Sequence, residues 1–171
     1  MLTVRTMTEA DVAAVSSIRV TGWQAAYAGI LPGSYLDRMT VEEDARQRRR
    51  HFAAPRADIA QSVAVDGQGE VVGWACLGPA RGDGAGADTG EVYALYVRPS
   101  LVGSGIGRTL LAAVHEDARV RGFRAMLLWV LTGNAPARRF YERAGYVADG
   151  AVRAEDYDGA SVSEVRYRRA L

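Results

Sequence analysis

Hydrophobic and polar residues repeat along this chain with two periods, one typical of helices and one typical of strands. Apolar residues recur at three- and four-residue steps over positions 12–20, which predicts an amphipathic helix that ends at about Gln24 or Tyr27. Thr8 followed by Asp11 is a capping-box variant and predicts where this helix begins.

A second capping box, Thr40 with Glu43, predicts another helix that ends near Phe52. Its later turns carry a basic cluster, Arg46, Arg48, Arg49, Arg50 and His51. Such a cluster could bind RNA, but cations at a helix end also interact favourably with the helix dipole, and acidic residues at 42–44 balance them. We therefore interpret the cluster as a solvated helix end.

Short apolar or β-branched runs predict strands at residues 2–5, 62–66, 71–77, 92–97, 125–131, 146–149 and 161–168. Between the fourth and fifth runs lies a helix whose apolar face is Leu110, Leu111, Val114 and Ala118, with His115 towards solvent. A strand, a helix and a strand in this order form a parallel pair with a right-handed crossover. The pattern therefore predicts an α/β fold with at least one parallel pair.

Length and composition limit the classes of function. The 171 residues, 49% hydrophobic and 24% charged, suffice for one globular domain, and a net charge of +1 provides no argument for nucleic acid or an anionic membrane as partner. The lone Cys76 excludes an internal disulfide and a multi-cysteine metal site. The N-terminus lacks the apolar stretch of a signal peptide, and no segment approaches the roughly 18 apolar residues of a membrane span. We expect one domain over residues 1–171, soluble and cytoplasmic, without a metal.

The stretch from Glu91 to Leu111, EVYALYVRPSLVGSGIGRTLL, reads as a strand, a glycine-rich turn and a helix. Pro99 ends the strand because it cannot donate to a strand ladder. Glycines at positions 103, 105 and 107 let N–H groups point into one space, and the positive end of the next helix faces the same space. This arrangement predicts a phosphate pocket. The glycine spacing excludes the dinucleotide fingerprint, and the absence of Gly-Lys-Ser/Thr excludes a Walker loop.

This stretch resembles the pyrophosphate loop of the GNAT superfamily of acetyl-CoA-dependent N-acetyltransferases. The family pattern is a strand ending in Val-x-Pro, then Arg/Gln-x-x-Gly-x-Gly/Ala opening a helix, and here Val97-Arg98-Pro99 precedes VGSGIG at 102–107. Val102 replaces the usual Arg or Gln, and Ser104 a frequent basic residue, so this loop must rely on backbone N–H groups and Arg108.

A second match follows the fifth predicted strand. The family commonly has Asn, an alanine-rich turn, Phe-Tyr-Glu and Gly-Phe/Tyr, which correspond here to Asn134, Ala137, Phe140-Tyr141-Glu142 and Gly145-Tyr146. The resemblance implies a mixed sheet of about six to seven strands, with helices on both faces and a central parallel pair that splays apart. The pantetheine arm of the cofactor would lie between the two splayed strands.

The resemblance also implies acetyl-CoA as cosubstrate and a set of site residues. The cofactor would be held by Leu95, Tyr96, Val97, Val102, Gly103, Ser104, Gly105, Ile106, Gly107, Arg108, Asn134 and Arg138. Tyr141 would protonate the departing thiolate, and Glu91 would take the proton of the amine. Trp23 and Tyr27 belong to a W-x-x-x-Y-x-G-x-L-P segment that in the family lies over the acceptor side.

Other readings of these residues stay open. Trp23 and Tyr27 could be core aromatics, Glu91 an exposed charge at a strand end, and Tyr141 a half-buried packing partner. For the whole chain, we expect transfer of acetyl to a primary amine, with a small molecule favoured over protein N-termini or lysines. A non-catalytic acyl-CoA sensor and a phosphate-binding protein unrelated to CoA are the alternatives, and a homodimer through the terminal strands is possible.

Overall fold

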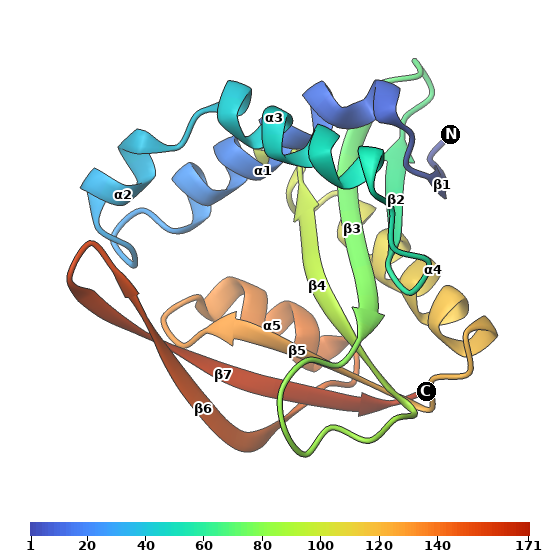
Figure 1. Cartoon of the computed structure of the whole chain (residues 1–171), viewed down its shortest axis with the longest axis vertical. Coiled ribbons are helices and arrows are strands. Elements are labelled where there is room, and N and C mark those ends of the chain that lie inside the picture. Colours follow the sequence, from blue (N-terminus) through green and yellow to red (C-terminus); the bar gives the residue numbers. More distant parts are fainter.

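The fold is built on one twisted sheet, and the computed structural model describes all 171 residues (Figure 1). In sheet order the strands are β1 (Thr3–Thr6), β2 (Ala60–Val65), β3 (Val71–Pro79), β4 (Thr89–Val97), β5 (Ala125–Leu131), β7 (Ala160–Ala170) and β6 (Val147–Tyr157). β4 and β5 run parallel, and every other neighbouring pair is antiparallel. The predicted α/β fold with a mixed seven-stranded sheet is confirmed.

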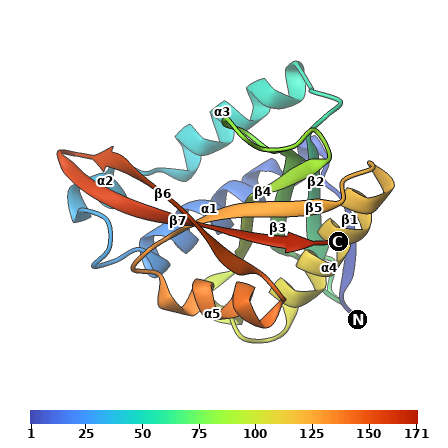
Figure 2. The ribbon, with the colours of Figure 1, turned by 90° about the horizontal axis from the view of Figure 1, so that it is seen from below.

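Helices cover both faces of this sheet, as Figures 1 and 2 show. They are α1 (Val12–Ala26), α2 (Gly33–Arg38), α3 (Val41–Ala53), α4 (Ile106–Val120) and α5 (Ala135–Arg143), with two 3₁₀ turns, η1 (Glu9–Asp11) and η2 (Pro99–Leu101). Both predicted helix starts are confirmed, because the Thr8 and Asp11 capping box is formed and the Thr40 side chain accepts from the N–H of Glu43. None of the helices is long and apolar enough to span a bilayer.

Each face of the sheet has its own hydrophobic core. On one face, the apolar side of α1 packs with α3 and the outer strands through Val12, Val15, Ile18, Ala45, Val63 and Trp74. On the other, α4 packs on the sheet through its predicted face, Leu110, Leu111, Val114 and Ala118. Cys76 is buried in the first of these cores, as its place in an apolar strand predicts.

The two parallel strands stay together only where they begin. Pairing between β4 and β5 covers three positions, from Thr89 opposite Ala125 to Glu91 opposite Leu127, and then ends. β4 also bulges at Tyr93, so that Tyr93 and Ala94 both pack on the α1 side of the sheet. Beyond Glu91, β5 therefore gives no hydrogen-bond partner to this edge of β4, and a cleft opens between the strands.

The last two strands are longer than predicted. β6 extends over residues 147–157 rather than 146–149, through a register shift between Ala148 and Val152. Its outer residues are exposed, and an edge strand that faces water needs no apolar alternation, which is why the pattern misses it. The tip of this hairpin reaches α2, where Arg38 and Ser34 both donate to Asp158. A small third core, Leu31, Leu36, Leu131 and Tyr157, fills the space beneath this contact.

Candidate active site

A cleft of about 1330 Å³ opens at the splayed strands. It is lined by α1, β4, the glycine turn, α4, β5, α5 and the β6–β7 hairpin. Of the predicted site residues, the cleft brings together Trp23, Tyr27, Glu91, Leu95, Tyr96, Val97, Val102, Gly103, Ser104, Gly105, Gly107, Arg108, Asn134 and Tyr141. Two others, Ile106 and Arg138, do not line it.

The glycine turn presents backbone donors to the cleft. Gly103 and Gly105 have φ angles of 89° and 91°, a conformation that L side chains rarely adopt, so glycine is required at both. The N–H groups that donate to no carbonyl of the turn or of the helix cap are those of Gly103, Gly105, Ile106, Gly107 and Arg108. The side chain of Ile106 is buried in the core, so only its backbone belongs to this site. Unpartnered N–H groups at a helix N-terminus are an anion site.

Two cations without a partner line the cleft that this turn borders. Arg108 in the first turn of α4 and Arg143 in the last turn of α5 both line the cleft, and neither forms a hydrogen bond or ion pair within the chain. The two helices approach closely, because a Cβ at Gly107 would meet the Phe140 ring at 3.4 Å. The sequence does not predict a role for Arg143, since a basic residue at a helix end is explained by the dipole alone.

Glu91 lies at the point where the strands separate, and it is buried. Its side chain is 2% exposed and forms an ion pair with Arg81 from the glycine-rich loop after β3. The Arg81 guanidinium also lies 4.0 Å from the centre of the Tyr93 ring. The reading of Glu91 as an exposed charge at a strand end is therefore wrong, because its carboxylate is inside the cleft with a fixed counter-ion.

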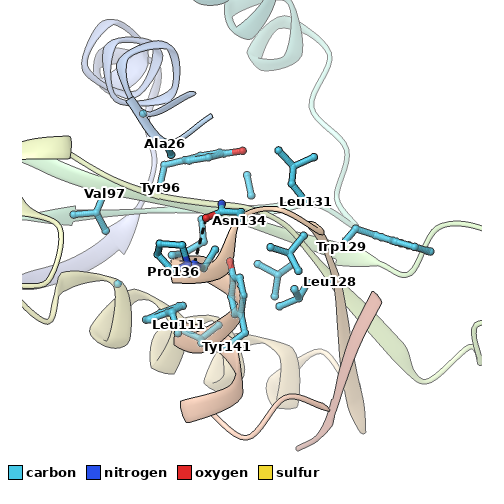
Figure 3. Close-up of a pocket in the computed structure, with 18 of the residues that line it drawn as sticks. Ala26, Tyr96, Val97, Leu111, Leu128, Trp129, Leu131, Asn134, Pro136 and Tyr141 are labelled. Carbon is cyan, nitrogen blue, oxygen red and sulfur yellow. Dashed lines mark hydrogen bonds between the residues drawn. The ribbon is translucent and has the colours of Figure 1, made fainter. Parts of the chain in front are cut away.

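Tyr141 and Asn134 face the cleft from α5. Figure 3 shows Tyr141 and, from β4, Tyr96 turned into the same opening, with Asn134 between them in this view. Asn134 Oδ1 caps α5 by accepting from the N–H of Ala137 at 3.4 Å, which leaves its amide NH₂ free to donate. Burial, and then the nearby Tyr96, raise the pKa of Tyr141, so its hydroxyl stays protonated at neutral pH.

Arg138 does not face the cleft, contrary to the expectation. Its Nε donates to the Tyr167 hydroxyl at 3.0 Å and its Nη1 to the Thr132 carbonyl at 3.0 Å. Glu142, one turn later on α5, accepts from the same Tyr167 hydroxyl at 2.7 Å. This side of α5 is therefore packed against β7, and Arg138 holds the helix on the sheet.

His115 is buried, which corrects the prediction that it faces solvent. It lies one turn after Leu111 on α4, at the flank of the buried face, and it is 5% exposed. Arg169 donates to Nδ1 at 3.1 Å, so Nε2 carries the hydrogen and donates to the Tyr146 hydroxyl at 2.8 Å. Burial, followed by the charge of Arg169, lowers the pKa of His115 to about 4.

The far end of the cleft is aromatic and contains charges of both signs. Trp23 Nε1 donates to the Tyr96 hydroxyl at 2.9 Å, and Tyr27 contacts Trp23 edge-on with ring centres 5.0 Å apart. Across the cleft, Arg153 and Glu164 form an ion pair at 2.6 Å. Trp23 and Tyr27 also pack against the small third core, which confirms the aromatic-core reading, and both line the cleft, while their role on the acceptor side stays a prediction.

The comparison with protein families decides what this arrangement is. A model described as "Acetyltransferase (GNAT) family" matches residues 23–146, from Trp23 to the tyrosine that follows α5. This chain belongs to the GNAT family of acetyltransferases. It is an N-acetyltransferase, as the resemblance of its motifs implies.

Two relatives illustrate how this acetyltransferase compares with others. It is 33% identical over 143 residues to the uncharacterized N-acetyltransferase YuaI of Bacillus subtilis, a match that covers 83% of this chain and 78% of that one. It is 36% identical over 88 residues to an L-methionine sulfoximine/L-methionine sulfone acetyltransferase of Pseudomonas aeruginosa, which covers 52% of this chain and 51% of that one. The chain thus spans about half of the length of this second relative.

Solved structures have the same fold over the whole chain. A putative phosphinothricin N-acetyltransferase superposes with a TM-score of 0.77 at 23% identity, covering 100% of this chain and 99% of that one. The PaiA N-acetyltransferase of Thermoplasma acidophilum, in complex with coenzyme A, superposes with a TM-score of 0.71 at 20% identity, again over 100% and 99%.

Sequence reasoning missed several residues that line the cleft of this acetyltransferase. They are Arg81, Trp129, Arg143, Arg153, Tyr157 and Glu164. Most of them come from segments whose pattern carries no chemical signal, an exposed loop and an edge hairpin. Only the sheet register, which places β6 and β7 beside β5, could have identified the four strand residues Trp129, Arg153, Tyr157 and Glu164 as neighbours.

Proposed function

We propose that this enzyme transfers an acetyl group from acetyl-CoA to a primary amine of a small molecule, directly, in a ternary complex. The proposal depends on one observation, that a site for an anion and two residues suited to proton transfer line the same cleft. An anion site made of unpartnered N–H groups lies at one end, and Glu91 and Tyr141 lie where the strands separate. A diphosphate and a reacting thioester would need this combination.

The residues present fit the cofactor. The glycine turn provides backbone donors for the diphosphate, and Arg108 and Arg143 add positive charge to the lining of the cleft. The free amide of Asn134 can donate to the pantetheine arm, and the edge of β4 left open by the splay offers backbone groups to it. Structures such as that of PaiA with coenzyme A support this assignment as fold-level analogy.

The chemistry requires a base, an oxyanion donor and an acid. Acetyl-CoA supplies an activated acetyl group. An amine has a pKa of about 10, so Glu91 takes its proton, directly or through water, before the nitrogen attacks. Backbone N–H groups around Leu95 to Val97 stabilise the oxyanion, and the protonated Tyr141 donates to the departing sulfur.

Support for a small-molecule acceptor comes from the acceptor end of the cleft and from a relative. The β6–β7 hairpin contacts α2 through Asp158 and lines the cleft through Arg153, Tyr157 and Glu164, so the acceptor would lie beside this hairpin. The relative from Pseudomonas aeruginosa is named for acetylating methionine sulfoximine and methionine sulfone, which are small molecules.

A screen of primary amines with acetyl-CoA, following free thiol, tests the proposal. We expect thiol release that depends on the amine. A Gly105→Glu variant should lose both acetyl-CoA binding and thiol release, because Gly105 has a φ of 91° and the new carboxylate would lie among the N–H groups. Val120→Glu, on the exposed side of α4, is the matched control and should keep both.

Other outcomes would contradict the proposal in different ways. Binding of acetyl-CoA without thiol release for any amine would favour the sensor, and acetylation confined to peptides would favour a protein acceptor. Thermal stabilisation by ATP or NAD but not by CoA would favour an unrelated phosphate-binding protein. Unchanged acetyl-CoA affinity in Gly105→Glu would show that the glycine turn does not hold the diphosphate.

A further inference from the structure

The acceptor end of the cleft contains an arginine that is held in place and still has free donors. Arg153 on β6 donates from Nε to Glu164 on β7 at 2.6 Å, and its guanidinium lies 4.2 Å from the centre of the Trp129 ring. All three residues line the cleft. The two terminal NH₂ groups of Arg153 donate to no other group of the chain. The guanidinium is therefore fixed by one edge and one face, with its other edge unoccupied.

The sheet register places this arginine on the same face as the candidate base. Glu164 pairs with Arg153 on one side and with Leu131 on the other, so the three side chains share a face. Glu91 pairs with Leu127, which lies four residues before Leu131 on β5 and hence points the same way. Arg153 and Glu91 thus both lie on this face of the sheet and line the cleft, and the two strands β5 and β7 separate them.

We propose that Arg153 binds a carboxylate on the acceptor, so that the substrates of this enzyme are amines that also carry a carboxylate, in the manner of amino acids. A free guanidinium edge matches a carboxylate in a planar, two-bond geometry. Glu164 already places one negative charge beside this arginine, so a singly charged group fits better than a phosphate dianion. This inference rests on the proposed transfer to a small amine and specifies its acceptor.

Matched pairs of acceptors test the carboxylate contact. Leucine, β-alanine and γ-aminobutyrate would each be compared with their own amides, in wild type and in Arg153→Ala. We expect the KM of the acids to rise roughly tenfold or more in the variant, with kcat little changed, because a hydrogen bond to a charged group is lost. The KM of the amides should stay within roughly twofold, since they never made this contact. Arg153→Lys should lie between the two, because it keeps the charge and loses the planar fork.

A neighbouring arginine provides the matched control. Arg166 lies near the same Trp129 ring, at 5.7 Å, but pairs with Asp149 at 2.7 Å and does not line the cleft. Arg166→Ala should therefore leave the KM of acids and amides unchanged. An Arg153→Ala effect equal on acids and amides, or absent from both, would overturn the proposal.

A binding measurement separates this proposal from the proposed reaction. Calorimetric titration with N-acetylleucine and N-acetylleucinamide needs no turnover. Tighter binding of the acid, lost in Arg153→Ala, would support the carboxylate site even if no amine were acetylated, in which case the proposed reaction alone would fail. Acetylation of amines with no preference that depends on Arg153 would leave the reaction standing and refute the carboxylate site.

Discussion

Tyr141 combines packing and chemistry in one side chain. Its ring contacts Phe140 and Tyr146 edge-on, with centres 5.1 and 5.8 Å apart, while the side chain borders the cleft. The packing fixes the direction of the ring. Burial raises the pKa of the hydroxyl, so this group stays protonated at neutral pH. A proton donor to a departing thiolate needs both properties.

Replacing Tyr141 with Phe should lower kcat by roughly a hundredfold, which is the usual contribution of a positioned acid. The affinity for CoA should hardly change, because the ring and its contacts remain. Thiol release measures the first quantity and calorimetry with CoA the second. Tyr35→Phe, a change to an aromatic residue of the third core outside the cleft, is the control. Full turnover by Tyr141→Phe would remove the assigned role.

At the residue scale, the sequence predicts side chains that follow a motif and fails for those that depend on tertiary neighbours. Tyr141 and Asn134 line the cleft as predicted, because the face of a helix on which two residues lie depends only on their spacing in the sequence. Arg138 has the same helical spacing, yet the hydroxyl of Tyr167 and the carbonyl of Thr132 engage it. Arg81 could not be found at all, because its partner Glu91 is ten residues away across a loop with no pattern.

At the scale of elements, the proposed anion site combines the glycine turn with the two helices around it. α4 begins at the turn with its positive end, and α5 is held close to α4 because Gly107 has no side chain. Arg108 comes from the first turn of α4 and Arg143 from the last turn of α5. The site therefore depends on the packing of two elements that are separated by β5.

Arg143, the arginine of α5 that lines the cleft, should contribute to cofactor binding. Arg143→Ala should weaken CoA binding roughly threefold or more, and the effect should shrink in high salt because the side chain is exposed. Arg139, on the same helix, is also exposed but does not line the cleft, so Arg139→Ala should bind CoA like wild type. Fluorescence or calorimetric titration at two salt concentrations measures both. Equal losses in the two variants would point to a general charge effect.

The helices and central strands were predictable because their apolar faces repeat with the period of the element. Capping residues fixed two helix starts, and the glycine turn fixed the start of α4 to within two residues. The full length of the β6–β7 hairpin was not predictable, since most of β6 is exposed and its composition is typical of a loop. Pairing with β7, which is a tertiary property, makes it a strand.

At the scale of the whole molecule, buried polar groups connect elements that the hydrophobic cores do not. Arg169 of β7 donates to His115 of α4 and to the carbonyl of Ala144 after α5, and His115 donates to Tyr146 before β6. His115, Ala144 and Arg169 of this network line the cleft, and its loss would loosen both α4 and α5. Its histidine also makes the stability of the molecule depend on pH.

The free energy of unfolding should fall as pH decreases from 6.5 towards 4. Burial lowers the pKa of His115 from 6.5 to about 4, so within this window the unfolded chain binds the proton and the folded one does not. The shift corresponds to roughly 3 kcal/mol, fully present above pH 6.5 and lost by about pH 4. Arg5 lowers the pKa of Asp11 from 3.8 to about 2, so Asp11 changes the free energy of unfolding only below about pH 4.

Urea unfolding at several pH values measures this dependence. The free energy of unfolding of His115→Gln should change less with pH than that of wild type, whatever its value at pH 7. His51→Gln, an exposed change on α3, should keep the wild-type slope. An unaltered slope in His115→Gln would mean that another group takes up the proton.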